Sequence, residues 1–317
     1  MSWDSVPWFT EGEAEHSSEV ARLLAYAAFG GAQGVVGAGD LQVRALATPG
    51  AAVQVLPGAC AITNRATGSA YQSYAARLPV GEQAPIAATG SAARSDLVVA
   101  RVENPFSYGE TWPNPSDPKV GPYIFTRVIS GVPKTTTSVR QIRPSDSAIT
   151  LARIDIPANT SSITQAMVKD LRRMVRPRKD RSIHTASPNG NQNWYGDKGV
   201  WHQWPAMARW QVDVPEWATQ ARITMTIAGT QVIDGNVWGG CAFRVGDQQG
   251  QSVQFESTSA RINLISADTL PIPAAMRGTT QWLEALILLD KKLPGWLQAD
   301  VVTTAIADVE WAETPEA

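Results

Sequence analysis

The run Ile149-Thr150-Leu151-Ala152-Arg153-Ile154-Asp155-Ile156-Pro157 is followed, after a short turn, by Ser162-Ile163-Thr164-Gln165-Ala166-Met167-Val168-Lys169-Asp170-Leu171-Arg172-Arg173-Met174-Val175-Arg176-Pro177. We interpret its first half as a β-strand. In the second half the apolar residues recur at helical spacing, and Ser162 and Gln165 have the spacing of a capping box. Pro177 would end the helix. The run therefore predicts one helix between the last strand of a first β module and the first strand of a second.

This predicted helix has an apolar face and a basic face. The apolar face consists of Met167, Leu171, Met174 and Val175, and the basic face of Lys169, Arg172, Arg173 and Arg176. We expect the apolar face to be buried, either on the first β module or against symmetry mates near an oligomer axis, and the arginines to face the second module or a neighbouring subunit.

The basic charge is local. Residues 151–181 contain eight Lys or Arg and three Asp or Glu, a net charge of +5, whereas the whole chain carries −2. Such a patch could contact nucleic acid or an acidic membrane surface. However, residues 182–317 contain eight basic and fourteen acidic residues. Pairing with acidic surfaces of the same chain or of neighbouring subunits is therefore the simpler interpretation. With a pI near 6.0 we expect no nucleic-acid partner.

Short segments with period-two patterning, separated by turn signals, lie on both sides of the predicted helix. Such spacing is the mark of an antiparallel sandwich or barrel. The expected strands are 41–46, 52–56, 59–63, 70–77, 85–88, 97–102 and 123–129 before the helix, and 220–228, 240–245, 252–256, 261–266, 280–290 and 300–311 after it. We predict a mainly β chain of two antiparallel β-sandwich (jelly-roll-like) modules joined by a helical connector.

A short helix is also predicted near the N-terminus, from Ser17 or Ser18 to Phe29, closed by Gly30 and Gly31. The residues before it, Trp3 to Glu15, have no periodicity and suggest an arm that orders on a partner. The expected domains are 1–34 (arm and helix for docking or oligomerisation), 35–157 (first β-sandwich), 158–185 (helical connector) and 186–317 (second β-sandwich).

Composition limits the class of protein. At 317 residues two domains are expected, and a charged fraction of 18% hints at area buried between subunits. The first residues lack the features of a signal peptide, and no apolar run has the length of a membrane span, so we expect a soluble protein without membrane insertion. Cys60 and Cys241 lie in different modules and suggest buried apolar residues rather than a disulfide or metal site.

No catalytic motif is present. The glycines Gly34-x-x-Gly37-x-Gly39 follow a helix and open a strand, the reverse of a phosphate-binding loop, and indicate a flexible joint. The histidines lack the spacing of metal ligands. Carboxylates for glycoside hydrolysis could come from any two strands, but the acidic candidates lie mostly in turn-like contexts: Asp234, Asp247, Glu256 and Asp268. We expect no enzyme activity, no cofactor and no metal.

Nine of the twelve tryptophans follow residue 190. An Asn/Gln/Gly-rich loop carries the candidate binding residues Trp194, Tyr195, Trp201, His202 and Trp204. Aromatic rings beside amides could bind a glycan, but the same composition serves a subunit interface or local packing, which we favour. A further five, Trp210, Trp217, Trp238, Trp282 and Trp311, lie in or beside expected strands and suggest core or rim packing.

A family resemblance rests on the order of several motifs. They are His16-Ser17-Ser18-Glu19-Val20-Ala21-Arg22-Leu23-Leu24-Ala25-Tyr26-Ala27, Gly34-Val35-Val36-Gly37-Ala38-Gly39-Asp40-Leu41-Gln42-Val43, Val53-Gln54-Val55-Leu56-Pro57-Gly58-Ala59-Cys60-Ala61-Ile62, Arg94-Ser95-Asp96-Leu97-Val98-Val99-Ala100-Arg101-Val102, Leu151-Ala152-Arg153-Ile154 and Asp170-Leu171-Arg172. In this order they resemble the minor tail (baseplate) proteins of long-tailed phages that infect actinobacteria. The resemblance covers about the first 180 residues.

The resemblance implies a structural subunit of the virion, at the tail tip, made in the cytoplasm of the bacterial host. It also implies an N-terminal β module that docks on other tail proteins, a C-terminal module that faces outward, a symmetric homo-oligomer, often a trimer, and no cofactor. A phage-derived injection system would share these residues. The alternative is a cell-wall carbohydrate-binding adhesin, and a glycan-cleaving enzyme is the least favoured interpretation.

Overall fold

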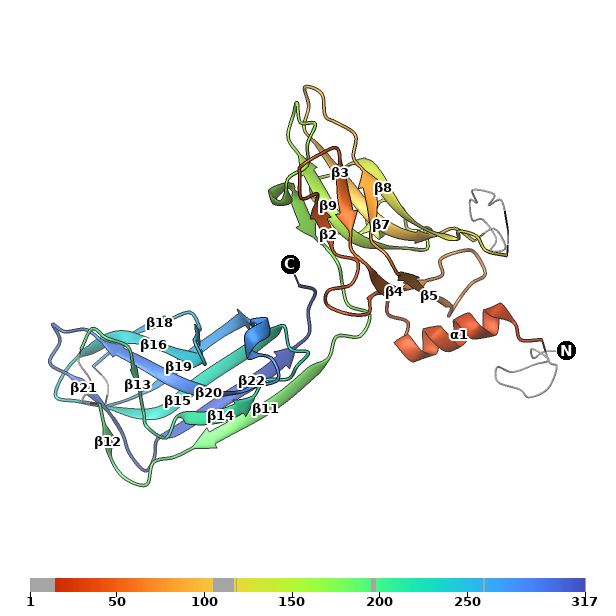
Figure 1. Ribbon diagram of the computed structural model, residues 1–317. Helices are drawn as coiled ribbons and strands as arrows, with labels where there is room; N and C mark the ends of the chain where they lie inside the picture. Colours follow the sequence, from red (N-terminus) through yellow and green to blue (C-terminus); the bar gives the residue numbers. More distant parts are fainter. Residues whose placement is uncertain (1–14, 105–116, 118, 195–197, 259, 317) are drawn as a thin grey trace. The chain divides into compact units, whose positions relative to one another are not determined.

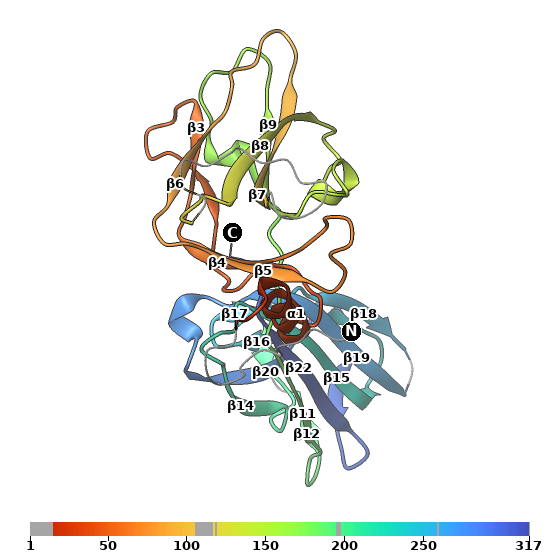
Figure 2. The ribbon, with the colours of Figure 1, turned by 90° about the vertical axis from the view of Figure 1, so that its right-hand side faces the viewer.

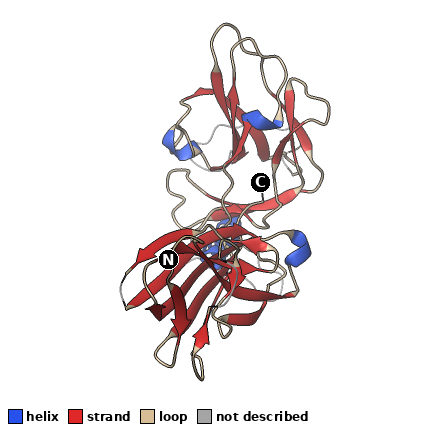
Figure 3. Ribbon diagram, turned by 90° about the vertical axis from the view of Figure 1, so that its left-hand side faces the viewer, coloured by secondary structure: helices blue, strands red, loops and turns tan. Residues whose placement is uncertain are grey.

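The computed structural model describes residues 15–104, 117, 119–194, 198–258 and 260–316. The chain divides into two compact units (Figure 1). Unit 1 comprises Met1–Arg176 together with Pro315–Ala317, and unit 2 comprises Pro177–Thr314. Both units consist mainly of antiparallel β-sheet, as Figure 3 shows by the predominance of strands, so the mainly β class predicted from the sequence is confirmed.

Unit 1 contains one described α-helix and three antiparallel sheets. The helix is α1 (Ser18–Phe29). The sheets follow the orders β1-β4-β5, β2-β3-β6 and β10-β9-β7-β8. The strands are β1 (Gly34–Val35), β2 (Val43–Ala45), β3 (Ala52–Val55), β4 (Gly58–Thr63), β5 (Ser73–Leu78), β6 (Glu82–Pro85), β7 (Arg94–Val102), β8 (Ile124–Val132), β9 (Ala148–Ile156) and β10 (Val168–Asp170). Side chains from all three sheets share one apolar core.

Helix α1 forms where its sequence predicts it. The Ser17 side chain accepts a hydrogen bond from the Glu19 amide, and Gly30 ends the helix in the left-handed conformation at φ 60°. The helix lies alongside β5 (Figures 1 and 2), and Tyr26 meets Tyr71 edge to face at 5.6 Å between ring centroids. None of its residues is fully buried, and Leu23 and Leu24 remain about half exposed.

The predicted helical connector does not form. Gln165–Met167 make a single 3-10 turn, η2, and the chain then continues as β10, antiparallel to β9. Farther on, Met174 bridges Val35 in a parallel arrangement. The Gln165 side chain accepts a hydrogen bond from the Ala45 amide instead of capping a helix. Pairing with β9 and β1 therefore outweighs the local helical pattern.

Unit 2 is built from two sheets whose orders are β11-β22-β15-β21-β12, with β19 on β15, and β13-β20-β16-β17, with β14 on β20 and β18 on β16. The strands of the first sheet are β11 (Lys179–Ala186), β12 (Gln192–Asn193), β15 (Gln220–Ile233), β19 (Arg261–Pro271), β21 (Trp296–Ala299) and β22 (Thr304–Ala312). Those of the second are β13 (His202–Gln203), β14 (Arg209–Asp213), β16 (Val237–Val245), β17 (Gln248–Gln249), β18 (Val253–Ser257) and β20 (Thr280–Leu289).

Some of these short strands lie end to end along the same neighbouring strand. Because β21 and β22 pair in turn along β15, and β13 and β14 along β20, each such pair counts as one strand. The described part of unit 2 then has the strand order β19, β15, β21/22, β11/12 in one sheet and β17/18, β16, β20, β13/14 in the other. This is the strand order of a jelly roll.

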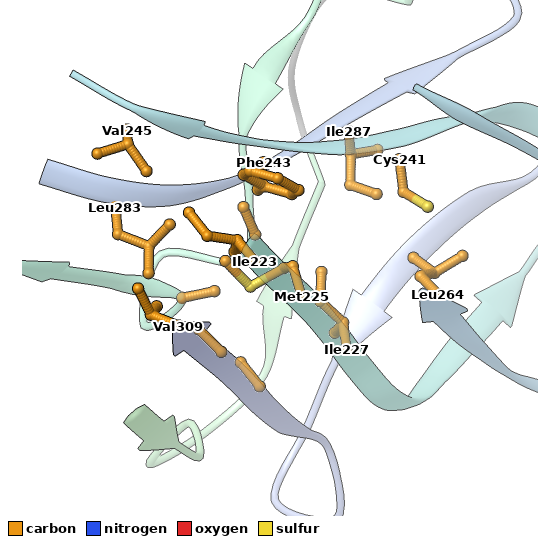
Figure 4. Packing of buried hydrophobic residues seen from close by; sticks show 14 of the residues in the cluster. Ile223, Met225, Ile227, Cys241, Phe243, Val245, Leu264, Leu283, Ile287 and Val309 are labelled. Carbon is orange, nitrogen blue, oxygen red and sulfur yellow. The ribbon is translucent and has the colours of Figure 1, made fainter. Parts of the chain in front are cut away.

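The core of unit 2 lies between its two sheets. Figure 4 shows Phe243 and Ile287 of one sheet pointing toward Ile223 and Met225 of the other. Along β16 and β20 the residues of the core alternate with residues that are absent from it. Because successive side chains of a strand point to opposite faces, the alternate residues lie on the outer face of the sheet.

Candidate functional site

Two of the predicted loop tryptophans belong to the core. Trp194 and Trp204 are 4% and 5% exposed and lie in the core of unit 2. Trp194 meets the His202 ring edge to face at 5.8 Å. Their indole faces are therefore not available to a sugar, and the possible glycan-binding role of these two residues is wrong: they serve local packing. Tyr195 lies outside the described residues.

Trp201 points the other way. It directly precedes β13, in which His202 pairs with the core residue Ile287 and therefore lies on the inner face of the sheet. Because successive side chains of a strand point to opposite faces, Trp201 lies on the outer face. A Cβ atom on Gly240 would lie 2.9 Å from the Trp201 ring. Gly240 therefore leaves the space that lets the indole cover this part of the sheet.

Two tryptophans that the sequence assigned to core or rim packing are exposed instead. Trp238 on β16 and Trp282 on β20 are each 41% exposed. Their parity places them on the outer face, because Phe243 and Leu283 have the opposite parity and lie in the core. By contrast Trp311 is 3% exposed and part of the core, as the sequence suggested.

The sequence contains a signal for the outward orientation of Trp238 and Trp282. Glu284 lies two residues after Trp282, and Arg244 lies six after Trp238, so each charged residue shares the face of its tryptophan. A charged residue inside an otherwise apolar strand marks the side that faces solvent, since charged groups are rarely buried without a partner. The apolar residues on both faces of these strands hid the signal.

We name the outer face of the β14-β20-β16-β18 sheet the tryptophan face. Its members are Trp201, Arg209, Gln211, Trp238, Arg244, Gln254, Glu256, Trp282 and Glu284. The strand registers fix their order. Trp282 lies beside Gln211 at one end, and Trp238 lies beside Glu256 at the other. Between these ends, Ala242 and Leu286 pair with each other across the two strands and are buried, at 1% and 3% exposed.

An ion-paired row crosses the tryptophan face. Arg209 and Arg244 flank Glu284 on neighbouring strands, with a 2.8 Å contact from Arg209 Nε to one carboxylate oxygen and a 2.5 Å contact from Arg244 Nη2 to the other. Glu284 is 6% exposed. The Arg209 guanidinium also lies over the Trp282 ring, 4.0 Å from its centroid. The ring is thereby held by a cation–π contact that is itself fixed by the buried carboxylate.

The residues of the predicted apolar helix face are buried or partly buried, although they do not lie on a helix face. Met174 and Val175 are 9% and 6% exposed, and Met167 and Leu171 pack on the apolar clusters of unit 1. They therefore contribute to the interior of unit 1 itself.

The predicted basic face is divided. Lys169, Arg173 and Arg176 are exposed on unit 1, and Arg176 donates to the Ala28 carbonyl at 2.7 Å. The Arg172 side chain is instead 0% exposed. It pairs with Asp170 at 2.7 Å and donates to the carbonyls of Ala38, Asp40 and Glu316. The expectation that Arg172 faces another module or subunit is wrong, because its donors are used inside unit 1.

The basic residues just beyond Pro177 pair with acidic residues of their own chain. In unit 2, Arg178 contacts Glu313, Lys179 contacts Glu310 and Arg181 contacts Asp308, at 2.8, 3.3 and 2.5 Å. The hydrogen bonds from Arg178 hold the pKa of Glu313 below its usual value, and those from Arg181 lower the pKa of Asp308. This is the intrachain pairing that the charge distribution predicted.

The described residues contain no group of three or more His, Cys, Asp or Glu side chains placed to hold a metal ion. Cys60 and Cys241 are free and buried, which confirms their prediction as apolar packing residues. Burial raises the pKa of the Cys60 thiol to about 12. Among the described helices, none has the length and apolarity needed to cross a membrane.

Comparisons with known proteins give little. No protein-family model matches the chain, and no curated protein matches it. Solved structures with some likeness include the VP2 subviral particle of infectious bursal disease virus, at 11% identity and TM-score 0.27 over 90% of this chain and 75% of that chain. T=1 particles derived from the same virus give 14% identity and TM-score 0.26 over 90% and 72%. Such TM-scores are too low to define a fold or a function.

Proposed function

We propose that the chain is a structural subunit of a phage tail tip, in which unit 1 docks on other tail proteins and unit 2 is the part presented to the host surface. One observation carries the proposal. The resemblance to minor tail proteins fades near residue 180, and unit 1 ends at Arg176. The resembling segment thus coincides with a unit that has its own core, and the residues from Pro177 to Thr314 form a separate β unit.

The test is the composition and labelling of virions. Antibodies raised against the full chain should decorate the tail tip of particles produced by the virus that encodes it, and peptides of the chain should occur in purified virions. A chain absent from purified particles would contradict the proposal.

The proposed assembly is a homo-oligomer, with a trimer favoured. Sedimentation of the full chain over a range of concentrations should give a species of three times 34.1 kDa. Light scattering that finds only the monomer, both alone and with the neighbouring tail proteins added, would argue against the oligomer.

The second candidate function is attachment to host cell-wall carbohydrate. The tryptophan face supports it, because exposed indole rings beside Gln, Arg and Glu side chains provide both stacking and hydrogen-bonding groups. The full chain should sediment with protein-stripped walls of the host, and Trp282→Ala should weaken this. Equal recovery of chain with and without walls would exclude attachment by this route.

A further inference from the structure

We infer that the tryptophan face is the binding surface for an extended neutral polysaccharide, which lies along the strands from Trp282 to Trp238. This inference rests on the second candidate function above and names its ligand class. It concerns unit 2 alone.

The length of the face favours a polymer over a single sugar. Trp282 lies near the start of β20, and Trp238 is in register with Asp290, whose amide donates to the Trp238 carbonyl at 2.8 Å. Eight residues of strand separate these two positions, a span of about 27 Å. Trp201 covers Gly240, one row of residues from Trp238. A ligand that touches all three rings must therefore be a chain of several units.

The charges of the face favour a neutral ligand. Arg209 and Arg244 are both paired with Glu284, and Glu256 lies beside Trp238. Asp213 has the parity of Gln211, and Asp290 is in register with Trp238, so the face carries no excess of positive charge. A polyanion such as nucleic acid needs several cations free to contact phosphates. Here the cations are already neutralised, while Gln211 and Gln254 offer amide donors and acceptors that suit hydroxyl groups.

The Trp282 end is preorganised. Arg209 stacks on the ring, Glu284 holds Arg209, and Arg244 holds the other oxygen of Glu284. Because these contacts exist before any ligand arrives, less side-chain entropy is lost on binding. Stacking of a pyranose on the remaining exposed part of the indole then adds apolar burial at small cost.

A protein partner fits the face less well. The cores of protein interfaces are depleted in charged residues and bury contiguous apolar surface. On this face Leu286 and Ala242 are already buried, and the exposed rings are separated by charged and amide side chains. A subunit interface is therefore kept as an outcome of the test.

The experiment uses the full chain in native gels that contain dextran, mannan or galactan, with polygalacturonate as an anionic comparison. The variants are Trp282→Ala and Trp238→Ala. The matched control is Trp217→Ala, because Trp217 is also a tryptophan of unit 2 stacked by an arginine, with the Arg178 guanidinium 5.4 Å from its centroid, but it lies outside the face. Thermal melting establishes that each variant is folded.

We expect at least one neutral polymer to retard the wild type and Trp217→Ala, with each face variant about tenfold weaker in affinity. Two results would overturn the inference: no retardation by any neutral polymer, whether or not polygalacturonate retards the chain, or equal retardation of the wild type and Trp282→Ala. Concentration-dependent self-association that Trp282→Ala abolishes would identify the face as a subunit interface and overturn it as well.

The outcomes separate the proposals. If the chain sediments with host walls in a Trp282-dependent manner but no neutral polymer retards it, the ligand class is wrong and attachment stands. If the chain does not sediment with walls, the proposed attachment to host walls is wrong. The native gels then still decide whether the tryptophan face binds a neutral polysaccharide. Neither assay requires a virion, so both leave the tail-subunit proposal to its own test.

Discussion

At the scale of single residues, Arg172 shows how a charge in a basic run can be structural. Its side chain is 0% exposed, and its guanidinium bonds to Asp170 and to three backbone carbonyls. Sequence alone cannot separate it from exposed Arg173, because both follow Asp170 in the same run. What separates them is the strand parity of an extended segment, which the predicted helix concealed.

Arg172→Met should destabilise unit 1 by about 2–3 kcal/mol, because it removes the guanidinium that pairs with Asp170 and donates to three backbone carbonyls. Urea unfolding followed by circular dichroism measures the change. The control Arg173→Ala alters an exposed neighbour and should stay within about 0.5 kcal/mol of the wild type. A loss of equal size in both variants would contradict the assigned role.

The pair Arg178–Glu313 predicts a pH dependence for unit 2. Hydrogen bonds from Arg178 lower the pKa of Glu313 from its ordinary 4.5. A carboxyl with a depressed folded pKa stabilises the fold above its unfolded pKa, and this stability is lost as the pH falls through the folded pKa. The melting temperature of unit 2 should therefore fall as the pH drops below 4.5, the ordinary pKa of this carboxyl, and it should fall less steeply in Glu313→Gln. Parallel pH profiles for both proteins would contradict this.

At the scale of elements, the segment that the sequence assigned to a helix instead joins two sheets. The Val35 amide donates to the Arg173 carbonyl, and the Val175 amide donates to the Val35 carbonyl, each at 2.8 Å. Gly34 permits this approach: a Cβ atom there would lie 2.1 Å from the Arg173 carbonyl oxygen. The glycine interpreted as part of a flexible joint is thus a site of close backbone contact.

Gly34→Ala should break this contact and destabilise unit 1 by at least about 2 kcal/mol. Faster hydrogen exchange at the Val35 and Val175 amides would locate the effect. Gly39→Ala provides the comparison, since a Cβ atom on Gly39 would have no neighbour within 4 Å. Unchanged exchange in Gly34→Ala would mean that the contact is not needed.

The sequence predicted the strands better than their partners. The expected strands 59–63 and 280–290 correspond to β4 and β20, because each is rich in apolar residues and is bounded by turn signals. The prediction of a helix after Ile163 was wrong, because apolar residues spaced by three and four fit a helix and an irregular extended chain equally well. Only long-range pairing with β9 and β1 decides between them, and single-sequence periodicity does not contain that information.

The sequence did not predict which tryptophans of unit 2 are exposed. The loop aromatic residues were possible glycan-binding or interface residues, with a subunit interface or local packing favoured, and among them Trp201 lies on the tryptophan face. Trp194 and Trp204 fill the core, while Trp238 and Trp282 were assigned to packing and are exposed. Where a strand is apolar on both faces, contact with the opposite sheet decides which face is buried. The local sequence does not contain that information.

At the scale of the whole molecule, the two units have separate cores but are joined twice along the chain. Unit 2 begins at Pro177 and ends at Thr314, and Pro315 and Glu316 belong to unit 1. There the Glu316 carbonyl accepts hydrogen bonds from Arg172 and Gln42, and its amide donates to Ala38. Unit 2 is thus inserted within unit 1.

A variant that ends at Thr314 should lower the stability of unit 1 by roughly 1–3 kcal/mol, because it removes these three bonds. Unit 2 should be unaffected, since the bonds between Thr314 and Thr219 remain. Calorimetry should resolve two transitions, assigned by their response to Arg172→Met and Glu313→Gln. A single transition that moves as a whole would show that the units do not unfold independently.

The way unit 2 is inserted has a consequence for how such chains can diversify. Its first and last strands, β11 and β22, are antiparallel neighbours, with Lys179 paired to Ala312 and the Glu313 amide donating to the Arg178 carbonyl. Entry and exit therefore lie side by side at one end of a single hydrogen-bonded ladder. A foreign domain whose own ends are adjacent could replace the whole jelly roll at these two junctions without disturbing the fold of the host unit. The layout of the chain therefore allows the inserted domain to be exchanged by recombination or by design.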